Sequence, residues 1–181
     1  VFVILAVSNS VNFADGMDGL ASVPAAVAFM VYAVLGYVIG NEVYSAYLHF
    51  DYIHGSGEIT VIGGAVLGAC MGFLWYNSYP AQVFMGDTGS MALGGLLSVV
   101  IILLKQEMLF LIVGGIFVVE GASVLIQQQI GFAILGRRLL LRAPIHHAFE
   151  RQGIAETKIV IRFWMVALIL GFVGILSLKI R

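Results

Sequence analysis

The sequence predicts an all-α protein, a polytopic bundle of membrane-spanning helices. Of its 181 residues, 61% are hydrophobic and only 10% are charged, and the mean hydropathy is +1.03. A soluble domain of this length could not bury so much apolar surface. The apolar residues form long runs without sustained alternation of period two, which favours helices over a β-barrel. We expect a single membrane domain, residues 1–181.

One short apolar run and five longer ones account for the expected helices. The run at 1–7 is about half of what a bilayer requires, so we expect a truncated first span and a chain that is the C-terminal half of a longer protein. Small residues recur in the second full run, from Gly63 to Gly72, and favour close helix packing. Mixed Gln, Arg and apolar residues at 127–141 predict that the fourth full run continues as an amphipathic helix. The five full runs are residues 20–39, 59–76, 91–104, 108–126 and 159–178.

The polar segments between these runs fall into two groups. If each run crosses once, segments 9–19, 77–90 and 131–158 share one side, and 41–58 and 105–107 the other. The opposite side and the tail contribute Lys105, Lys179 and Arg181, whereas the last segment of the first side holds Arg137, Arg138, Arg142, Arg151 and Lys158. Basic residues favour the cytoplasmic side, so we expect the first group to be cytoplasmic.

The first cytoplasmic segment carries two amides and two carboxylates near a helix end. Asn9, Asn12 and Asp15 are three residues apart and share one helix face. Asp15 and Asp18 each precede a glycine, which for Asp15 is Gly16, and glycine lets backbone N–H groups approach a ligand. The group could bind a sugar hydroxyl, a base edge or a cation. A capped helix end is the alternative, but it explains two polar residues better than four.

The second cytoplasmic segment places Asp87 just before the third full run. Mg²⁺ prefers one or two protein carboxylates and leaves its other positions to phosphate and water, so Asp87 is a candidate metal ligand. A helix N-cap, worth about 1 kcal/mol, is the alternative, and both roles could coexist. Phe84, beside Gly86, is either an interface anchor or a ring that stacks on a flat base.

The third cytoplasmic segment has adjacent histidines, His146 and His147, among arginines. Imidazolium and guanidinium groups bind phosphate. A Zn²⁺ site is disfavoured because no further His or Cys lies nearby in the sequence. Histidines near lipid headgroups are the alternative interpretation.

Glu120 lies within an apolar run, where an ionisable side chain is costly and usually faces the bundle interior. We expect a structural role, with Gln127, Gln128 or a residue of the absent half as its partner.

Together, the three cytoplasmic segments resemble the phospho-N-acetylmuramoyl-pentapeptide transferase family, one of the polyprenyl-phosphate N-acetylhexosamine-1-phosphate transferases within glycosyltransferase family 4. The matching residues are Asn-x-x-Asn-x-x-Asp-Gly-x-Asp-Gly-Leu at 9–20, Phe-Met-Gly-Asp-Thr-Gly-Ser at 84–90 and Ala-Pro-Ile-His-His at 143–147. Their order and spacing match across essentially the whole chain. The Pro-Ile-His-His sequence and residues 162–164 resemble the muramoyl-pentapeptide branch more than its N-acetylglucosamine relatives.

The resemblance implies the first membrane step of peptidoglycan synthesis, on the cytoplasmic face of a bacterial inner membrane. UDP-N-acetylmuramoyl-pentapeptide and undecaprenyl phosphate would give lipid I and UMP, with Mg²⁺ as cofactor. Membrane lipid surrounds such an enzyme, a homodimer is an expectation of the family alone, and no nucleic-acid partner is expected.

The resemblance also implies roles for particular residues. It assigns Mg²⁺ to Asp87, and the chemistry to Asp87, Asp15, His146 and His147. The expected substrate-binding residues are Asn9, Asn12, Asp15, Gly16, Asp18, Asn77, Phe84, Gly86 and Gln127. Ala148 stands where the family commonly has a third His. The paired aspartates of an earlier cytoplasmic loop do not occur in this chain, so alone it is expected to lack part of the site.

Three alternatives remain open from the sequence. The nearest is a related transferase that uses UDP-N-acetylglucosamine. A transporter would use Glu120, Asp15 and the histidines as an ion path, but the polar residues gather in loops instead of at mid-membrane. The third alternative is a fragment without catalytic activity.

Overall fold

The structure, a computed structural model, describes residues 1–179; Arg181 lies outside the described residues. It contains helices and, within the described range, no strand, which confirms the predicted all-α class. The elements are α1 Phe2–Ala14, α2 Ser22–Ile39, α3 Glu42–Tyr47, α4 Glu58–Asn77, α5 Gly86–Leu103, α6 Glu107–Val113, α7 Gly115–Leu125, η1 Ile126–Ile134, α8 Ile145–Arg151 and α9 Glu156–Ser177.

Five helical segments are long and apolar enough to cross a membrane, and α1 is a shorter apolar helix. The predicted five spans and shorter first helix are therefore confirmed, and the chain is a multi-pass membrane protein. The five segments are Ser22–Ile39, Glu58–Asn77, Gly86–Leu103, Gly115–Ile134 and Glu156–Ser177.

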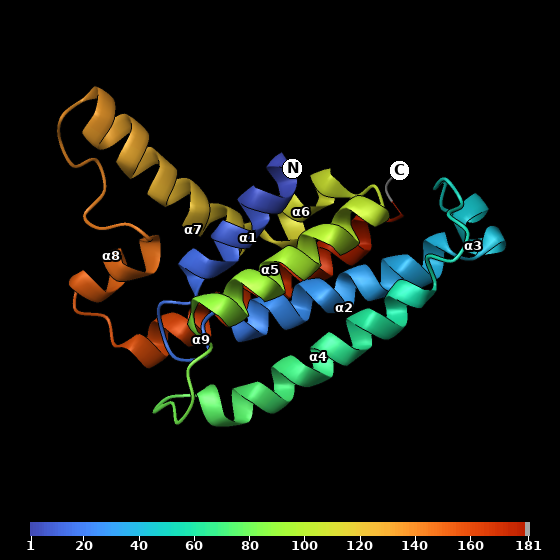
Figure 1. Ribbon diagram of the computed structural model, residues 1–181, viewed down its shortest axis with the longest axis horizontal. Helices are drawn as coiled ribbons and strands as arrows, with labels where there is room; N and C mark the ends of the chain where they lie inside the picture. The colour runs from blue at the N-terminus through green and yellow to red at the C-terminus, as the bar shows by residue number, and fades with distance from the viewer. Residues whose placement is uncertain (180–181) are drawn as a thin grey trace.

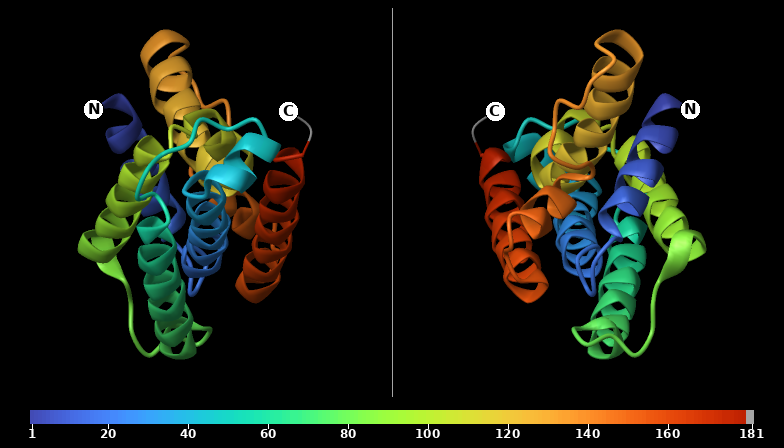
Figure 2. Two further views of the ribbon diagram at one scale, coloured as in Figure 1. Left: turned by 90° about the vertical axis from the view of Figure 1, so that its right-hand side faces the viewer. Right: turned by 90° about the vertical axis from the view of Figure 1, so that its left-hand side faces the viewer.

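Helix α2 forms the centre of the bundle. It packs against α4, α5 and α9, and Figure 2 shows it between α4 and α9. The largest fully buried side chains include Phe29, Tyr32 and Leu35 from this helix. Because α2 carries no charged residue and is mostly buried, it is the core element on which the outer helices pack.

Glycines set two of the helix approaches. A Cβ at Gly63 would lie 2.7 Å from the Ala33 side chain, and one at Gly94 would lie 2.7 Å from the Ser8 backbone. The α2–α4 and α1–α5 contacts therefore require these glycines. The predicted packing role is confirmed for the first glycine of its run. Among the described residues, added Cβ atoms at Gly64, Gly68 and Gly72 would meet nothing within 4 Å, so their role stays a prediction.

The predicted span at 108–126 was wrong in its bounds. The chain breaks at Gly114, between α6 and α7, and the helix that follows continues as a π-helix to Ile134. The Phe110 ring lies directly over Gly114, where any Cβ would overlap it. Two consecutive glycines weaken the helix at this point. The predicted continuation past residue 126 is confirmed as far as Ile134, and residues 135–144 form a loop.

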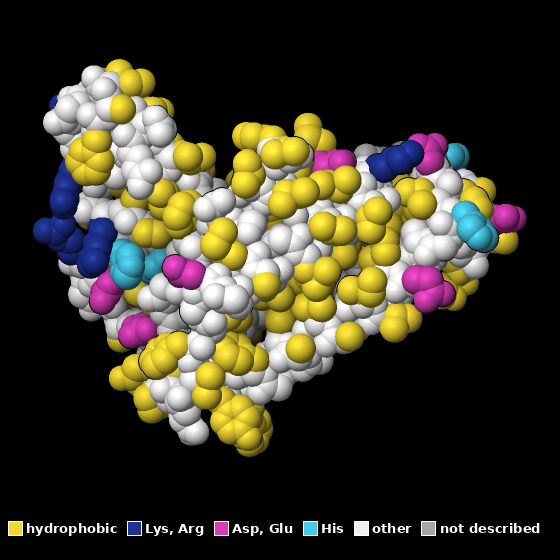
Figure 3. Space-filling model, viewed as in Figure 1, with side chains coloured by type: hydrophobic (Ala, Val, Ile, Leu, Met, Phe, Trp, Pro, Cys, Tyr) yellow, Lys and Arg dark blue, Asp and Glu magenta, His cyan; other side chains and the backbone are white. Residues whose placement is uncertain are grey.

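Three loops gather at one end of the bundle, as the alternation of spans predicts. We call residues 15–21 the first loop, 78–85 the second loop and 135–144 the third loop. All three lie at the left of Figure 1, whereas α3 lies at the opposite end. Helices α7 and η1 leave the bundle at an angle and carry the third loop. Figure 3 shows basic side chains concentrated at this same end.

Candidate functional site at the loop end

The first loop is fixed by hydrogen bonds from distant helices. Helix α1 ends at Ala14, and Asp15 follows as its C-cap. Asn77 Oδ1 accepts from Gly19 N at 3.0 Å, and Trp164 Nε1 donates to Gly19 O at 3.0 Å. Gly19 has φ of +73°, which an L side chain rarely adopts. The first loop is thus held between the end of α4 and the N-terminal half of α9.

Asn77 and Asp18, both predicted to bind substrate, also connect the first and second loops. Asn77 is 3% exposed; its Oδ1 also accepts from Ser22 Oγ, and its Nδ2 donates to Val83 O at 2.9 Å. Asp18 Oδ2 accepts from Ala81 N at 2.9 Å. Both side chains order the second loop, and substrate contact stays a prediction for both.

A hydrogen bond between Asn12 and Ser90 joins the end of α1 to the first turns of α5. Ser90 Oγ donates to Asn12 Oδ1 at 2.6 Å and also lies 3.1 Å from Gly86 O. Gly86 begins α5 with φ of +65°. Asn9 turns away from this contact, because its Nδ2 donates to Leu5 O within α1 at 2.8 Å.

Asp15 and Asp87 form a pair of mutually repelling carboxylates. The pKa of Asp15 is raised from 3.8 to about 6. The larger cause is burial of the carboxyl group, and the second is the negative charge of Asp87. Asp87 is exposed in the first turn of α5 and makes no hydrogen bond or ion pair through its carboxylate within residues 1–179. Neither carboxylate forms an ion pair with a cationic side chain among residues 1–179, so a bound cation would stabilise the two.

We expect the substitution Asp15→Asn to stabilise the protein in a pH-dependent way. Above pH 6 the carboxylate is ionised in both the folded and the unfolded chain, and only the folded chain carries the cost of burial and repulsion. Between pH 6 and 3.8 the folded chain takes up a proton, and below 3.8 both forms are protonated. The advantage of Asn should therefore be largest above pH 6 and fade toward pH 3.8. Thermal unfolding in detergent from pH 4 to 8 measures it; an advantage independent of pH would contradict the assignment.

His146 and Glu120 form a fully buried pair. His146 Nδ1 lies 3.1 Å from Glu120 Oε1, and both side chains are 0% exposed. The contact is within ion-pair distance, although its angle is not that of a hydrogen bond. Glu120 Oε2 accepts from Ile145 N at 2.9 Å. Neither Gln127 nor Gln128 is the partner of Glu120, contrary to the prediction; its carboxylate instead holds the first residues of α8, 25 residues along the chain. A partner in the absent half stays a prediction.

Gly16 lies directly against the imidazole of His146. A Cβ at position 16 would overlap His146 Nε2, and that nitrogen is buried without a hydrogen-bond partner within the described residues. The contact brings the first loop and α8 together, and it gives Gly16 a steric role that a loop sequence does not reveal.

His147 is more open than its neighbour. Its ring centroid lies 4.2 Å from that of His146, and its Nδ1 lies 3.0 Å from Glu150 Oε2. This hydrogen bond is the main cause that lowers the pKa of the exposed Glu150 carboxyl. Ala148, in the position of the family's third His, is buried, so the open face of α8 in this segment presents His147.

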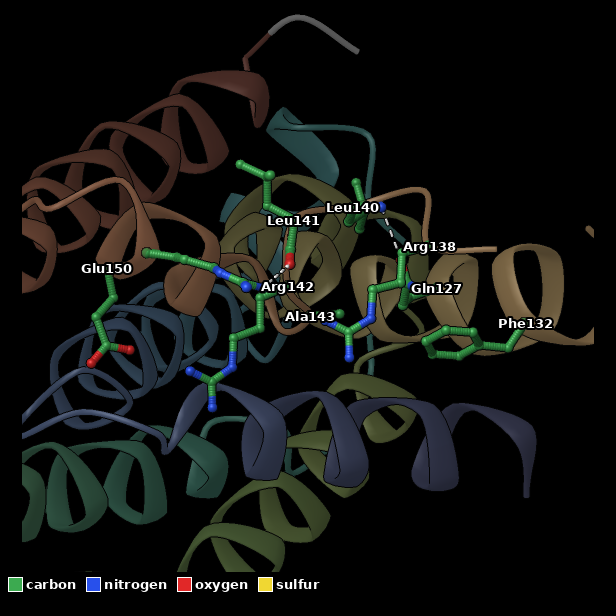
Figure 4. Close-up of a pocket in the computed structure, with 9 residues that line it drawn as sticks. Gln127, Phe132, Arg138, Leu140, Leu141, Arg142, Ala143 and Glu150 are labelled. Carbon is green, nitrogen blue, oxygen red and sulfur yellow. Dashed lines mark hydrogen bonds between the residues drawn. The ribbon is translucent and has the colours of Figure 1, made fainter. Parts of the chain in front are cut away.

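Gln127 holds the third loop and lines a cavity of about 770 Å³ beside it (Figure 4). Its Oε1 accepts from Leu139 N at 3.2 Å and from Leu140 N at 2.9 Å. Three arginines line the same cavity, Arg138, Arg142 and Arg151. The sequence pointed to an Arg-rich cytoplasmic segment but could not place these side chains around one space.

The donor atoms at this end of the bundle suit Mg²⁺ better than Zn²⁺. Within residues 1–179, no group of three or more His, Cys, Asp or Glu side chains could hold a metal ion. Mg²⁺ commonly binds through one or two carboxylates and completes its coordination with substrate phosphates and water. Asp87, exposed and repelled by Asp15, offers such a carboxylate.

The remaining predicted residue, Phe84, is 73% exposed in the second loop, just ahead of Asp87. A ring so placed is free to stack on a base, and this role stays a prediction. Sequence reasoning missed Ser90 as the link to Asn12, although a serine one turn after Asp87 was visible. It also missed Glu120 as the partner of His146, for which the sequence gives no local signal.

Known proteins are similar to this chain along its whole length. A family model described as Glycosyl transferase family 4 matches residues 1–105. The chain is 49% identical over 181 residues to the phospho-N-acetylmuramoyl-pentapeptide-transferase of Rickettsia massiliae, and 51% identical over 181 residues to the protein of that name from Desulfosudis oleivorans. In both cases the match covers 100% of this chain and 50% of the relative. The chain therefore spans about half the length of the curated relatives it matches.

Proposed function

Because the chain belongs to glycosyl transferase family 4, we propose that it forms the C-terminal half of a phospho-N-acetylmuramoyl-pentapeptide transferase. The donor would be UDP-N-acetylmuramoyl-pentapeptide and the acceptor undecaprenyl phosphate, giving lipid I and UMP. The observation that carries the proposal is the convergence of three distant segments at one end of the bundle, with Asp15 paired to Asp87 and Gly16 packed on His146. The relatives, named for this reaction, support it.

The reaction is a displacement at phosphorus. An oxygen of the lipid phosphate attacks the phosphorus that carries the sugar, the bond from that phosphorus to the bridging oxygen breaks, and UMP leaves with the electron pair. Such transfers depend mainly on positioning and on stabilising the negative charge of the transition state. Mg²⁺, when bound at Asp87, would supply positive charge beside the donor's diphosphate.

The protein's own groups would orient the donor. Phe84 would stack on the uracil, and the first loop, with Asp15, Gly16 and Asp18, would contact the uridine and diphosphate. His147, which lies on the open side of α8, would donate to a phosphate oxygen. His146 would keep α8 in register through Glu120 and present Nε2 toward the first loop.

The loop end would face the cytoplasm of a bacterial inner membrane. The four arginines between 137 and 151 all lie in the third loop or α8, and basic loop residues favour the cytoplasmic side. A cytoplasmic site would meet the soluble nucleotide donor directly.

Two observations bear on the alternatives. The candidate residues Asp15, Asp18 and Phe84 lie in loops at one end of the bundle, which favours a transferase over an ion path through the membrane. The share of the relatives' length that the chain spans keeps a fragment without activity of its own as an outcome of the test.

The test measures UMP release in detergent with undecaprenyl phosphate as acceptor, with and without Mg²⁺. The donor is either UDP-N-acetylmuramoyl-pentapeptide or UDP-N-acetylglucosamine. It compares the chain alone with a full-length form that also carries the N-terminal half found in the relatives. We expect release by the full-length form only, dependent on Mg²⁺ and on UDP-N-acetylmuramoyl-pentapeptide. Release with UDP-N-acetylglucosamine instead would favour the related transferase, and no release by folded protein would contradict the proposal.

A further inference from the structure

The cavity beside the third loop has a surplus of positive charge. Arg138, Arg142 and Arg151 line it, and Glu150 is the single carboxylate among its lining residues. Glu150 is already paired with His147 at 3.0 Å. Figure 4 shows Arg138 and Arg142 extending in the same direction from the third loop. Guanidinium groups arranged in this way suit a planar oxyanion, which they can bind through two parallel hydrogen bonds.

A buried, unused hydrogen-bond donor also lines this cavity. Gln127 is 5% exposed, and its Nε2 has no acceptor among residues 1–179. The orientation of the amide is determined, because Oε1 accepts from two backbone N–H groups of the third loop. A buried N–H group without an acceptor destabilises the folded protein, and a ligand that accepts its hydrogen bond would remove this cost. An oxyanion in the cavity would provide it.

The cavity lies beside the candidate reaction centre instead of within it. Glu150 links the cavity to His147, whereas Asp15 and Asp87 lie among the first two cytoplasmic segments and line no part of it. A group bound here would therefore belong to a part of the substrate beyond the diphosphate.

We propose that this cavity binds a carboxylate of the peptide on the transferred sugar. The inference rests on the proposed function, since it requires a donor that carries a peptide. A peptide joined to the sugar through its amino end retains a free carboxylate at its other end. UDP-N-acetylglucosamine has no carboxylate, so the cavity would distinguish the two donors. A phosphate of a lipid headgroup has similar oxyanion chemistry and is the competing source.

Two adjacent arginines provide a matched test. Arg138 lines the cavity and Arg137 does not, although both are exposed in the third loop. In the full-length form, we expect Arg138→Gln to raise KM for the peptide donor about tenfold, the effect of losing one charge-assisted hydrogen bond, with kcat nearly unchanged. Arg137→Gln should leave both constants unchanged. A donor whose C-terminal carboxylate is converted to an amide should have a raised KM with the unsubstituted full-length form, here called the parent. Its KM should not rise further with Arg138→Gln.

Two outcomes would overturn the inference, and a third would contradict the proposed function alone. An equal rise in KM for the acid and amide donors would mean that Arg138 serves the diphosphate. If Arg138→Gln raises KM in vesicles with anionic phospholipid but not in neutral vesicles, the ligand of the cavity is the phosphate of a lipid headgroup. If the parent turns over neither donor, the proposed function fails; calorimetric binding of the two donors to the parent and to Arg138→Gln then decides the subsite by itself.

Discussion

Asp87→Asn should lower turnover of the full-length form at least about a hundredfold, the scale of losing one group that stabilises transition-state charge. Asparagine keeps the size of the side chain but loses the negative charge that would hold Mg²⁺. The fold should be unaffected, because the carboxylate is exposed and makes no hydrogen bond or ion pair within the described residues. Removal of the charge also relieves the repulsion on Asp15.

UMP release and thermal unfolding in detergent, measured on the same preparations, separate these effects. Asp51→Asn is the matched control, since Asp51 is an exposed aspartate after α3, at the opposite end of the bundle. We expect the unfolding temperature of Asp87→Asn to equal or exceed that of the parent, and its stabilisation by added Mg²⁺ to be lost. Turnover close to that of the parent would remove Asp87 from the proposed metal site.

Glu120→Ala should cause the largest loss of stability. The change leaves the fully buried His146 and the partly buried Ile145 N–H without their common partner. Breaking a buried pair by removing one member costs on the order of 3–5 kcal/mol. Helix α8 begins at Ile145, so we expect it to shift and to move both histidines. Unfolding temperature and turnover should therefore fall together.

Glu120→Gln separates packing from charge. The amide fills the same volume and still offers an oxygen to Ile145 N, so the loss of stability should be well below that of the alanine variant. If the two variants unfold at the same temperature as the parent, Glu120 does not anchor α8. If the glutamine variant keeps its stability but loses turnover, the reaction requires the negative charge of Glu120 beside His146.

The sequence predicted the helices better than their junctions. Long apolar runs predict the all-α class and the number of spans, because a run of about twenty apolar residues has the length of a membrane-spanning helix. The break at Gly114 was missed because both sides of it are equally apolar, so hydropathy does not change there. Consecutive glycines, with Phe110 four residues earlier, were the available signal.

The site followed a similar pattern. The sequence indicated Asp15, Asp87 and the two histidines as candidates because they are polar residues close to apolar runs. Their mutual contacts could not be predicted, because the Gly16–His146 and Glu120–His146 contacts depend on how α1, α7 and α8 pack. Asn77 illustrates the same limit, since an amide at a helix end looks available to a ligand but is buried here between two loops.

The break at Gly114 changes how the molecule fits its bilayer. As one straight rod, the segment from Glu107 to Ile134 would measure about 40 Å, whereas the hydrocarbon layer is about 30 Å thick. Bending lets α6 remain with the bundle while α7 and η1 run obliquely outward. We therefore expect the inclination of this arm to depend on membrane thickness. Since Gln127 lies within this arm and the third loop follows its end, we expect lipid chain length to affect the arginine cavity.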